Sequence, residues 1–223
     1  MKKREAFTLA EALSSIMILA FIVGTLLPML TVNSKITEYK AGYQRAINNL
    51  NSAYANYLQG KDKNTDGSYL DPLYIGTIDK NNASHKMNTS EDIVNNLFKK
   101  YLSITDYEAG TFPGCVKRAP NGEEKEEDVE DPKIFYTTDG MRYCVIYDTC
   151  TYNQVYADST CGEIWVDVNG KDGPNQIAKS NAHPADIYPV AILKDRFIPG
   201  RGTVQESADA VTTYAQNLYF GVN

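Results

Sequence analysis

The stretch that decides the fold is the apolar run FTLAEALSSIMILAFIVGTLLPMLTV, which occupies residues 7–32. Its only charged residue is Glu11, and a short basic leader containing Lys2, Lys3 and Arg4 precedes it. At roughly 26 residues the run exceeds the ~20 that a helix needs to cross a bilayer, and it is longer than the ~7–15-residue apolar core of an ordinary signal peptide. We therefore expect a membrane-spanning helix that stays in the protein.

Glu11 is the informative exception inside this run. A carboxylate at the bilayer centre costs on the order of 2.5–3.5 kcal/mol, and less near the end of a span. A charge kept at such a cost predicts a specific partner. The alternative is a plain single-pass anchor in which the acid has no role.

The residues around Glu11 read AFTLAEAL, residues 6–13, and follow the basic leader directly. They resemble the processing signal of type IV prepilins, the family of type IV pilins and type II secretion pseudopilins. This resemblance implies that prepilin peptidase cuts between Ala6 and Phe7 and methylates the new amine of Phe7. Glu11 would then be the fifth mature residue and Pro28 the twenty-second, where many pilins also carry proline.

The physics of assembly agrees with this alignment. Cleavage creates an ammonium group at Phe7, and Glu11 of one subunit can pair with the Phe7 amine of a stacked neighbour. A lone buried charge thereby becomes a paired one, which favours assembly in register. Glu11 and Pro28 are the assembly residues that the resemblance implies.

Charge and topology fit an exported subunit. Removing residues 1–6 takes away a net charge of +2, so the formal −6 of the whole chain becomes −8. An acidic protein is a poor general binder of nucleic acid, because phosphate contacts need Lys and Arg. The positive-inside rule places the leader in the cytoplasm and the part after Val32 beyond the membrane. About 190 residues remain there, enough for one compact domain.

The helix is expected to continue beyond the membrane as an amphipathic extension over residues 33–59, with Gly60 as its stop. Apolar side chains recur there every three or four residues, at Ile36, Tyr39, Tyr43, Ile47, Leu50, Tyr54 and Leu58. Gly24 and Pro28 lie inside the long helix, and either residue can kink it.

Residues 60–223 are predicted to form a globular α+β head. A short amphipathic helix is expected over residues 88–103, with Asn88 or Thr89 as its cap, and Asp139-Gly140 reads as a hairpin turn. The predicted strands are 133–138, 141–148, 163–168, 187–193 and 196–198. We expect a pilin-like architecture, in which an antiparallel sheet packs on the distal half of the long helix.

Four cysteines, Cys115, Cys144, Cys150 and Cys161, lie in the part predicted to be exported. An even number in an oxidising compartment predicts two disulfides, and none of the spacings is the Cys-x-x-Cys of a zinc or redox site. Three connectivities are possible. We favour Cys150 with Cys161, which closes a short loop between two strands and leaves Cys115 with Cys144.

One loop has oxygen-bearing side chains at alternate positions, namely Asp62, Asn64 and Asp66, followed by Gly67. This matches the first half of an EF-hand calcium loop, but Leu73 stands where the bidentate Glu is expected. A plain polar turn is the alternative to calcium.

A second loop, residues 167–175, resembles a turn in the head of some calcium-binding pseudopilins. Asp167 and Asn169 are its candidate ligands, and Lys171 stands where an oxygen would be needed. A turn that closes on its own Asx hydrogen bonds is the favoured alternative.

A catalytic site is not expected, because neither histidine lies in a recognised nucleophile or metal motif. The leading hypothesis is a structural subunit of a type IV pilus or type II secretion pseudopilus in the bacterial inner membrane. Its partners would be prepilin peptidase, other pilin subunits and an inner-membrane assembly platform, and its filament would lie in the periplasm or at the cell surface. The alternative is a membrane-tethered ligand-binding module that forms no filament.

Overall fold

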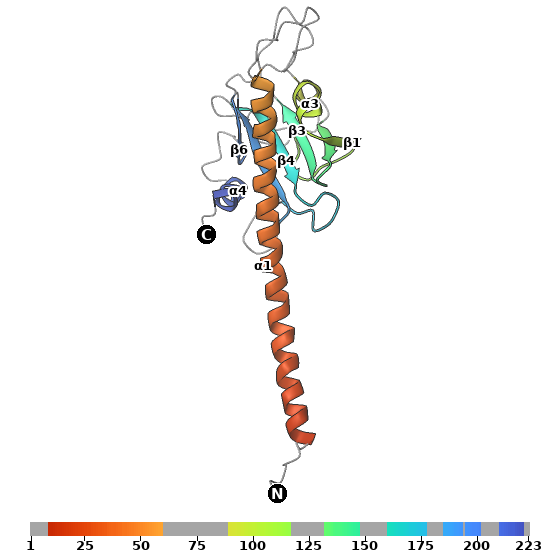
Figure 1. Ribbon diagram of the computed structural model, residues 1–223, viewed down its shortest axis with the longest axis vertical. Helices are drawn as coiled ribbons and strands as arrows, with labels where there is room; N and C mark the ends of the chain where they lie inside the picture. The colour runs from red at the N-terminus through yellow and green to blue at the C-terminus, as the bar shows by residue number, and fades with distance from the viewer. Residues whose placement is uncertain are drawn as a thin grey trace, which may run out of the picture. The chain divides into compact units, whose positions relative to one another are not determined.

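The computed structural model describes residues 9–59, 89–116, 132–147, 160–177, 185–193, 195–201 and 210–220. The chain divides into two compact units, residues 1–38 and residues 39–223. Helix α1, Leu9–Leu58, begins in the first unit and ends in the second (Figure 1). The long helix predicted from the apolar run and its extension is therefore confirmed, with its end within one residue of the expected position.

Within the described part of α1, the backbone is helical through Gly24 and Pro28. Gly24 has no other part of the structure close to it. The kink that these two residues permit does not interrupt the helix, which keeps helical geometry over 50 residues.

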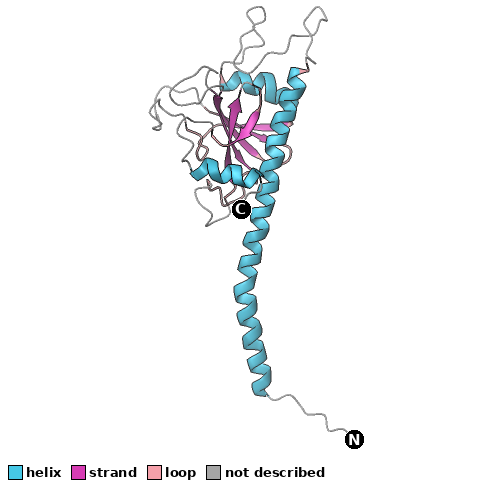
Figure 2. Ribbon diagram, turned by 90° about the vertical axis from the view of Figure 1, so that its left-hand side faces the viewer, coloured by secondary structure: helices cyan, strands magenta, loops and turns pink. Residues whose placement is uncertain are grey.

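The second unit is built on one antiparallel sheet of six strands in the order β1-β2-β3-β4-β5-β6. The sheet is drawn in magenta in Figure 2. Every strand pairs with the next one along the chain, so the sheet is a meander. The strands are β1 Ile104–Glu108, β2 Lys133–Thr137, β3 Arg142–Tyr147, β4 Thr160–Asp167, β5 Ile187–Leu193 and β6 Phe197–Pro199.

One face of the sheet packs on residues 39–58 of α1. Tyr43, Ile47 and Leu50 are almost completely buried there, at exposed fractions of 0%, 1% and 0%. Opposite them lie inward-facing strand residues such as Tyr143 and Tyr188, in the same apolar cluster. The helix extension predicted for residues 33–59 thus forms part of the head's core from Tyr39 onward, because its apolar stripe is the surface that the sheet needs to cover.

Side chains of α1 also form hydrogen bonds with backbone groups of the sheet. The Tyr43 hydroxyl donates to the carbonyl of Pro189 in the middle of β5. The Asn51 amide accepts from the backbone N–H of Phe197 at 2.9 Å and donates to its carbonyl at 3.0 Å. Asn51 therefore occupies backbone groups of the short edge strand β6, which limits pairing with another chain there.

The opposite face of the sheet carries a second, smaller apolar cluster. It includes the only tryptophan, Trp165, which is 1% exposed, together with Phe112, Cys144 and Ile187. Strands β3 and β5 are consequently buried on both faces, which explains their nearly continuous apolar sequences.

Three short helical segments precede β1, and they are α2 Ser90–Ile93, the π-helical turn η2 Val94–Phe98 and α3 Lys99–Tyr101. The Thr89 hydroxyl accepts the backbone N–H of Asp92 at 3.0 Å, so Thr89 is the N-cap. The helix predicted for residues 88–103 is confirmed, with a π turn that the apolar spacing did not indicate.

The predicted hairpin at Asp139-Gly140 is confirmed. It joins β2 to β3, and Gly140 has a φ of +82°, a conformation that glycine adopts without strain. Two elements were not predicted: strand β1 and helix α4, Ala210–Phe220. Most of β1 is exposed, so its sequence lacks the apolar alternation that marks a strand.

Cys115 and Cys144 form a disulfide, which is the pairing favoured for these two residues. The bond ties the segment before residue 117 to the centre of β3. Cys161 is also disulfide-bonded. Cys150, its predicted partner, lies outside the described residues.

Replacing both Cys115 and Cys144 with Ala is expected to lower the free energy of unfolding by about 3 kcal/mol, because the bond closes a loop with a sequence separation of 29 residues. Urea unfolding of the full chain in detergent, followed by Trp165 fluorescence, measures the change. A midpoint equal to that of the unmodified protein would contradict a stabilising role for this disulfide.

Candidate assembly segment and head loop

The first part of α1 presents an apolar surface on all sides. The segment Leu9–Leu26 has a mean hydropathy of 2.0, and none of it is buried. By length and composition it is able to cross a membrane, a property that it shares with signal sequences. Large apolar side chains are exposed along it, and these are Leu9, Leu13, Ile16, Met17, Ile18, Leu19, Phe21, Ile22, Val23 and Leu26.

Hydroxyl groups in this segment are satisfied within the helix. Ser14 and Ser15 donate to the backbone carbonyl of Glu11 at 3.0 and 2.8 Å. Thr25 donates to the carbonyl of Phe21 at 3.0 Å. These bonds let the hydroxyls enter an apolar environment without an outside partner. The Glu11 carboxylate is the only charged group in the segment Leu9–Leu26.

Glu11 lies in the first turn of the described helix and its side chain is exposed. The helix dipole favours a negative charge at the N-terminal end of a helix. Ala6 and Phe7, the predicted processing residues, lie outside the described residues. Pro28 has a helical backbone, and its side chain also lies outside the description.

The head loop between β4 and β5 contains the second predicted calcium site. Asp167 and Asp186 are both fully buried at the ends of these strands. The Asp186 carboxylate accepts the backbone N–H groups of Asn175 and Gln176 at 2.8 and 2.7 Å, one on each oxygen. Asp167 accepts the N–H of Asn169 at 3.4 Å. The two acids therefore hold the two ends of the loop to the sheet.

Asn175 completes this closure. With its amide nitrogen facing the acid, it donates to Asp167 at 2.9 Å and to the carbonyl of Gly170 at 3.1 Å. Its backbone has a positive φ of 51°, which Asn tolerates better than most residues. These contacts agree with the favoured alternative for the loop, a turn that closes on its own hydrogen bonds.

No family model, curated protein or solved structure matches the chain.

Lys171 holds the outer side of the loop. Its ammonium lies 3.7 Å from a Glu108 oxygen and 5.0 Å from the centre of the Tyr136 ring. The other Glu108 oxygen accepts the Tyr136 hydroxyl at 2.6 Å and the Arg142 side chain at 2.8 Å. These contacts, the Tyr136 bond foremost, lower the pKa of Glu108. Lys171, which stands where a calcium ligand would be needed, therefore ties the loop to Glu108 on β1 and to Tyr136 on β2.

Calcium binding by Asp167 and Asn169 stays a prediction. Among the described residues, no group of three or more His, Cys, Asp or Glu side chains is placed to hold a metal ion. Asp62, Asn64 and Asp66 lie outside the described residues. Sequence reasoning missed Asp186 and Glu108, and the one signal for Asp186 is its position directly before strand β5.

The buried carboxyl group of Asp167 predicts a pH dependence of stability. Burial, with the nearby Asp186 carboxylate as the second cause, raises the pKa of Asp167 from 3.8 to about 7. At a pH between these two values, Asp167 is protonated in the folded chain and ionised in the unfolded chain. The free energy of unfolding therefore contains a contribution from Asp167 that is lost as the pH rises through this window.

We expect the Asp167 contribution to fall by about 2 kcal/mol between pH 5 and pH 8. Urea unfolding at the two pH values, compared between the natural chain and Asp167→Asn, isolates it from the other titrating groups. The substituted chain should lose less stability on the way to pH 8. An identical loss in both chains would show that Asp167 is ionised throughout.

Proposed function

We propose that this protein is a structural subunit of a bacterial envelope filament, either a type IV pilus or a type II secretion pseudopilus. One observation carries the proposal: a single helix contains both an exposed apolar segment with one acid, Glu11, and a face that is the core of an α+β head. The exposed apolar segment suits a subunit that is held in a membrane before assembly. The buried face of the same helix attaches the head to it, so the head moves with the helix when the subunit is extracted.

The proposed mechanism is assembly rather than chemistry. After cleavage before Phe7, the subunit waits in the inner membrane until an assembly platform extracts it. The apolar surface of residues 9–26 then exchanges lipid for the same segment of neighbouring subunits. Because the hydroxyls of this segment are satisfied within the helix, Glu11 is the group that gains most from a partner of opposite charge.

N-terminal peptide mass spectrometry of the protein from native membranes tests the first step. We expect a chain that begins at Phe7 and is heavier by one methyl group on its amine. Replacing Phe7 with Asp should leave the full-length chain uncut, whereas replacing Ser34 with Ala, in the same helix but far from the cut, should not change processing.

A chain that still begins at Met1 would overturn prepilin processing. The protein would then be better described as a membrane-tethered head that binds a ligand without forming a filament. A cut beyond residue 26 would indicate removal of the apolar segment by an ordinary signal peptidase, and the Leu9–Leu26 segment would then have no role in assembly.

A further inference from the structure

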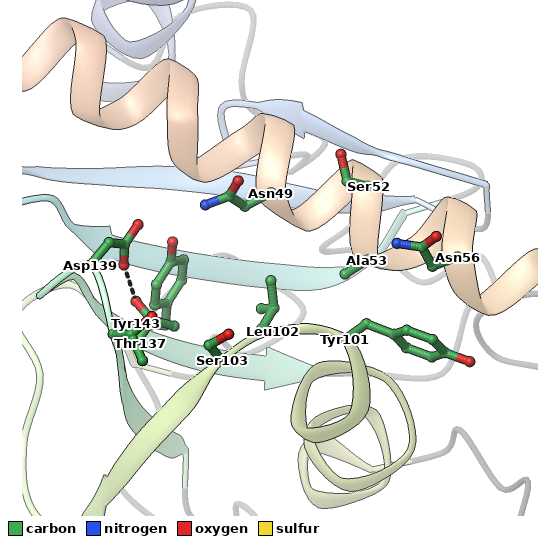
Figure 3. A pocket seen from close by; sticks show the side chains of 11 residues that line it. Asn49, Ser52, Ala53, Asn56, Tyr101, Leu102, Ser103, Thr137, Asp139 and Tyr143 are labelled. Atoms are coloured by element: carbon green, nitrogen blue, oxygen red, sulfur yellow. Dashed lines mark hydrogen bonds between the residues drawn. The ribbon is translucent and has the colours of Figure 1, made fainter.

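A polar cleft lies in the head between the end of α1 and the β2–β3 hairpin (Figure 3). Its volume is about 290 Å³, close to the lower end of the ~300–1,000 Å³ typical of small-molecule pockets. The wall from α1 consists of Asn49, Ser52, Ala53 and Asn56. The facing wall consists of Tyr101, Leu102, Ser103, Thr137, Thr138, Asp139 and Tyr143.

Several polar side chains of the cleft are available to a ligand. Asn49, Ser52, Ser103 and Thr138 are exposed lining residues, so the amide of the first and the hydroxyls of the other three are accessible from solvent. Together they offer both donors and acceptors. Because they come from both walls, a bound molecule would have hydrogen-bonding groups on opposite sides.

The cleft is close to electrically neutral. Asp139 is the only charged residue among the described lining residues, and it accepts the Thr137 hydroxyl and lies 3.7 Å from the Arg45 guanidinium. Burial, with Asp139 as the second cause, raises the pKa of Tyr143, so its phenol stays uncharged. This arrangement disfavours a charged ligand of either sign, since neither charge would find an unpaired opposite.

Apolar side chains complete the lining of the cleft, and these are Ala53 on α1 and Leu102 on the facing wall (Figure 3). Tyr101 lies at one end, where its ring meets Tyr57 edge to face at 6.4 Å between centroids and points away from the polar side chains (Figure 3). A ligand that carries apolar C–H groups as well as several hydroxyls fits this mixture of apolar and polar lining.

We propose that this cleft binds an uncharged saccharide of one or two rings. Sugar hydroxyls both donate and accept, as do the amide and hydroxyls that line the cleft. The larger groove beside β1, about 520 Å³, is a weaker candidate, because its Lys133 and Glu91 already pair at 3.3 Å. The proposal does not rest on filament assembly, because all the lining residues belong to the second unit.

Saturation-transfer NMR on the full chain tests the proposal. The protein is kept in a polyoxyethylene detergent, whose head group carries no sugar, and is mixed in turn with the methyl glycosides of glucose, galactose, mannose, N-acetylglucosamine and N-acetylgalactosamine, and with lactose and maltose. We expect at least one neutral sugar to bind, and N-acetylneuraminic acid and glucosamine to bind at least tenfold more weakly.

Substitutions locate the site. Asn49→Leu and Ser103→Leu each place an apolar side chain in the cleft and should weaken binding at least tenfold. Asn48→Leu is the matched control, because Asn48 is the exposed neighbour on α1 and does not line the cleft. Trp165 fluorescence on unfolding verifies that all three chains are folded.

Two results would overturn the proposal. One is that no neutral sugar of the panel binds, even when the sugar is present at tens of millimolar and in 50-fold excess over the protein. The other is binding that Asn49→Leu and Ser103→Leu leave within twofold of the unmodified chain. A preference for a charged sugar would also contradict it, because the cleft has no unpaired charge to offer.

Discussion

We expect filament incorporation to fall at least a hundredfold when Glu11 is replaced with Gln. Glutamine keeps the size of the side chain but removes the charge, so in the proposed pairing the Phe7 ammonium of the neighbour would be left buried without its partner. Breaking a buried ion pair in this way costs about 3–5 kcal/mol, which corresponds to a factor of more than a hundred in an equilibrium. The expected result is a subunit that inserts and is processed but stays in the membrane.

Shearing of filaments from cells, followed by quantification of the subunit in the sheared and membrane fractions, measures this effect. For a secretion pseudopilus, overproduction of the subunit provides the filaments. Ser14→Ala is the matched control: its hydroxyl donates within the helix to the Glu11 carbonyl, so its loss should leave incorporation within twofold.

Glu11→Gln chains that enter filaments as well as the natural chain would exclude the proposed pairing. A second substitution separates pairing from simple polarity. Glu11→Asp keeps the charge on a shorter side chain and should restore part of the incorporation that Gln abolishes. If Glu11→Asp fails as completely as Glu11→Gln, the charge alone is not sufficient and the length of the side chain is also required.

The largest effect on head stability is expected from Gly162→Ala. Gly162 lies on β4 beside a register shift and has a φ of +145°. A Cβ atom there would lie 2.2 Å from the Ile146 carbonyl oxygen and 2.9 Å from the Tyr147 Cα, both in the paired strand β3. Backbone of a central strand has no room to move aside. We expect the free energy of unfolding to fall by about 5 kcal/mol from clash and strain together.

Gly110→Ala separates the two causes. Gly110 has almost the same φ, +147°, but nothing lies within 4 Å of its Cβ position. Its substitution should cost only the conformational strain, about 1–3 kcal/mol. Gly173→Ala, with open space and no positive φ, should be nearly neutral. Urea unfolding followed by Trp165 fluorescence compares the three chains, and equal effects of Gly162→Ala and Gly110→Ala would refute the proposed clash.

Sequence patterns predicted the elements whose signals are local. The α1 stripe from Tyr39 to Leu58, the Thr89 cap and the Asp139-Gly140 turn each depend on neighbouring residues, and each is confirmed. Strand β1 was missed because its residues are mostly exposed and polar, so it is held by pairing with β2 rather than by a buried face. Helix α4 lacks an acidic first turn and a basic last turn, the charge signals of helix ends.

The head loop shows why contacts distant in sequence escape prediction. Asp186 was not selected, since nothing near it in the sequence indicates that its oxygens accept N–H groups ten and eleven residues earlier. The sequence places Lys171 where a calcium ligand would be needed, but it does not indicate the contact of Lys171 with Glu108, which joins residues far apart in the chain. Such contacts follow from the sheet order, which residue spacing alone does not determine.

The position of α1 in the core also has a consequence for biosynthesis. Tyr43 contacts the Tyr219 ring, and Gln44 donates to the Tyr219 carbonyl at 2.7 Å across 175 residues of sequence. Helix α1 is synthesised before helix α4, so the apolar stripe of α1 lacks part of its cover until α4 has left the ribosome. The head therefore completes its core only after α4 has been made.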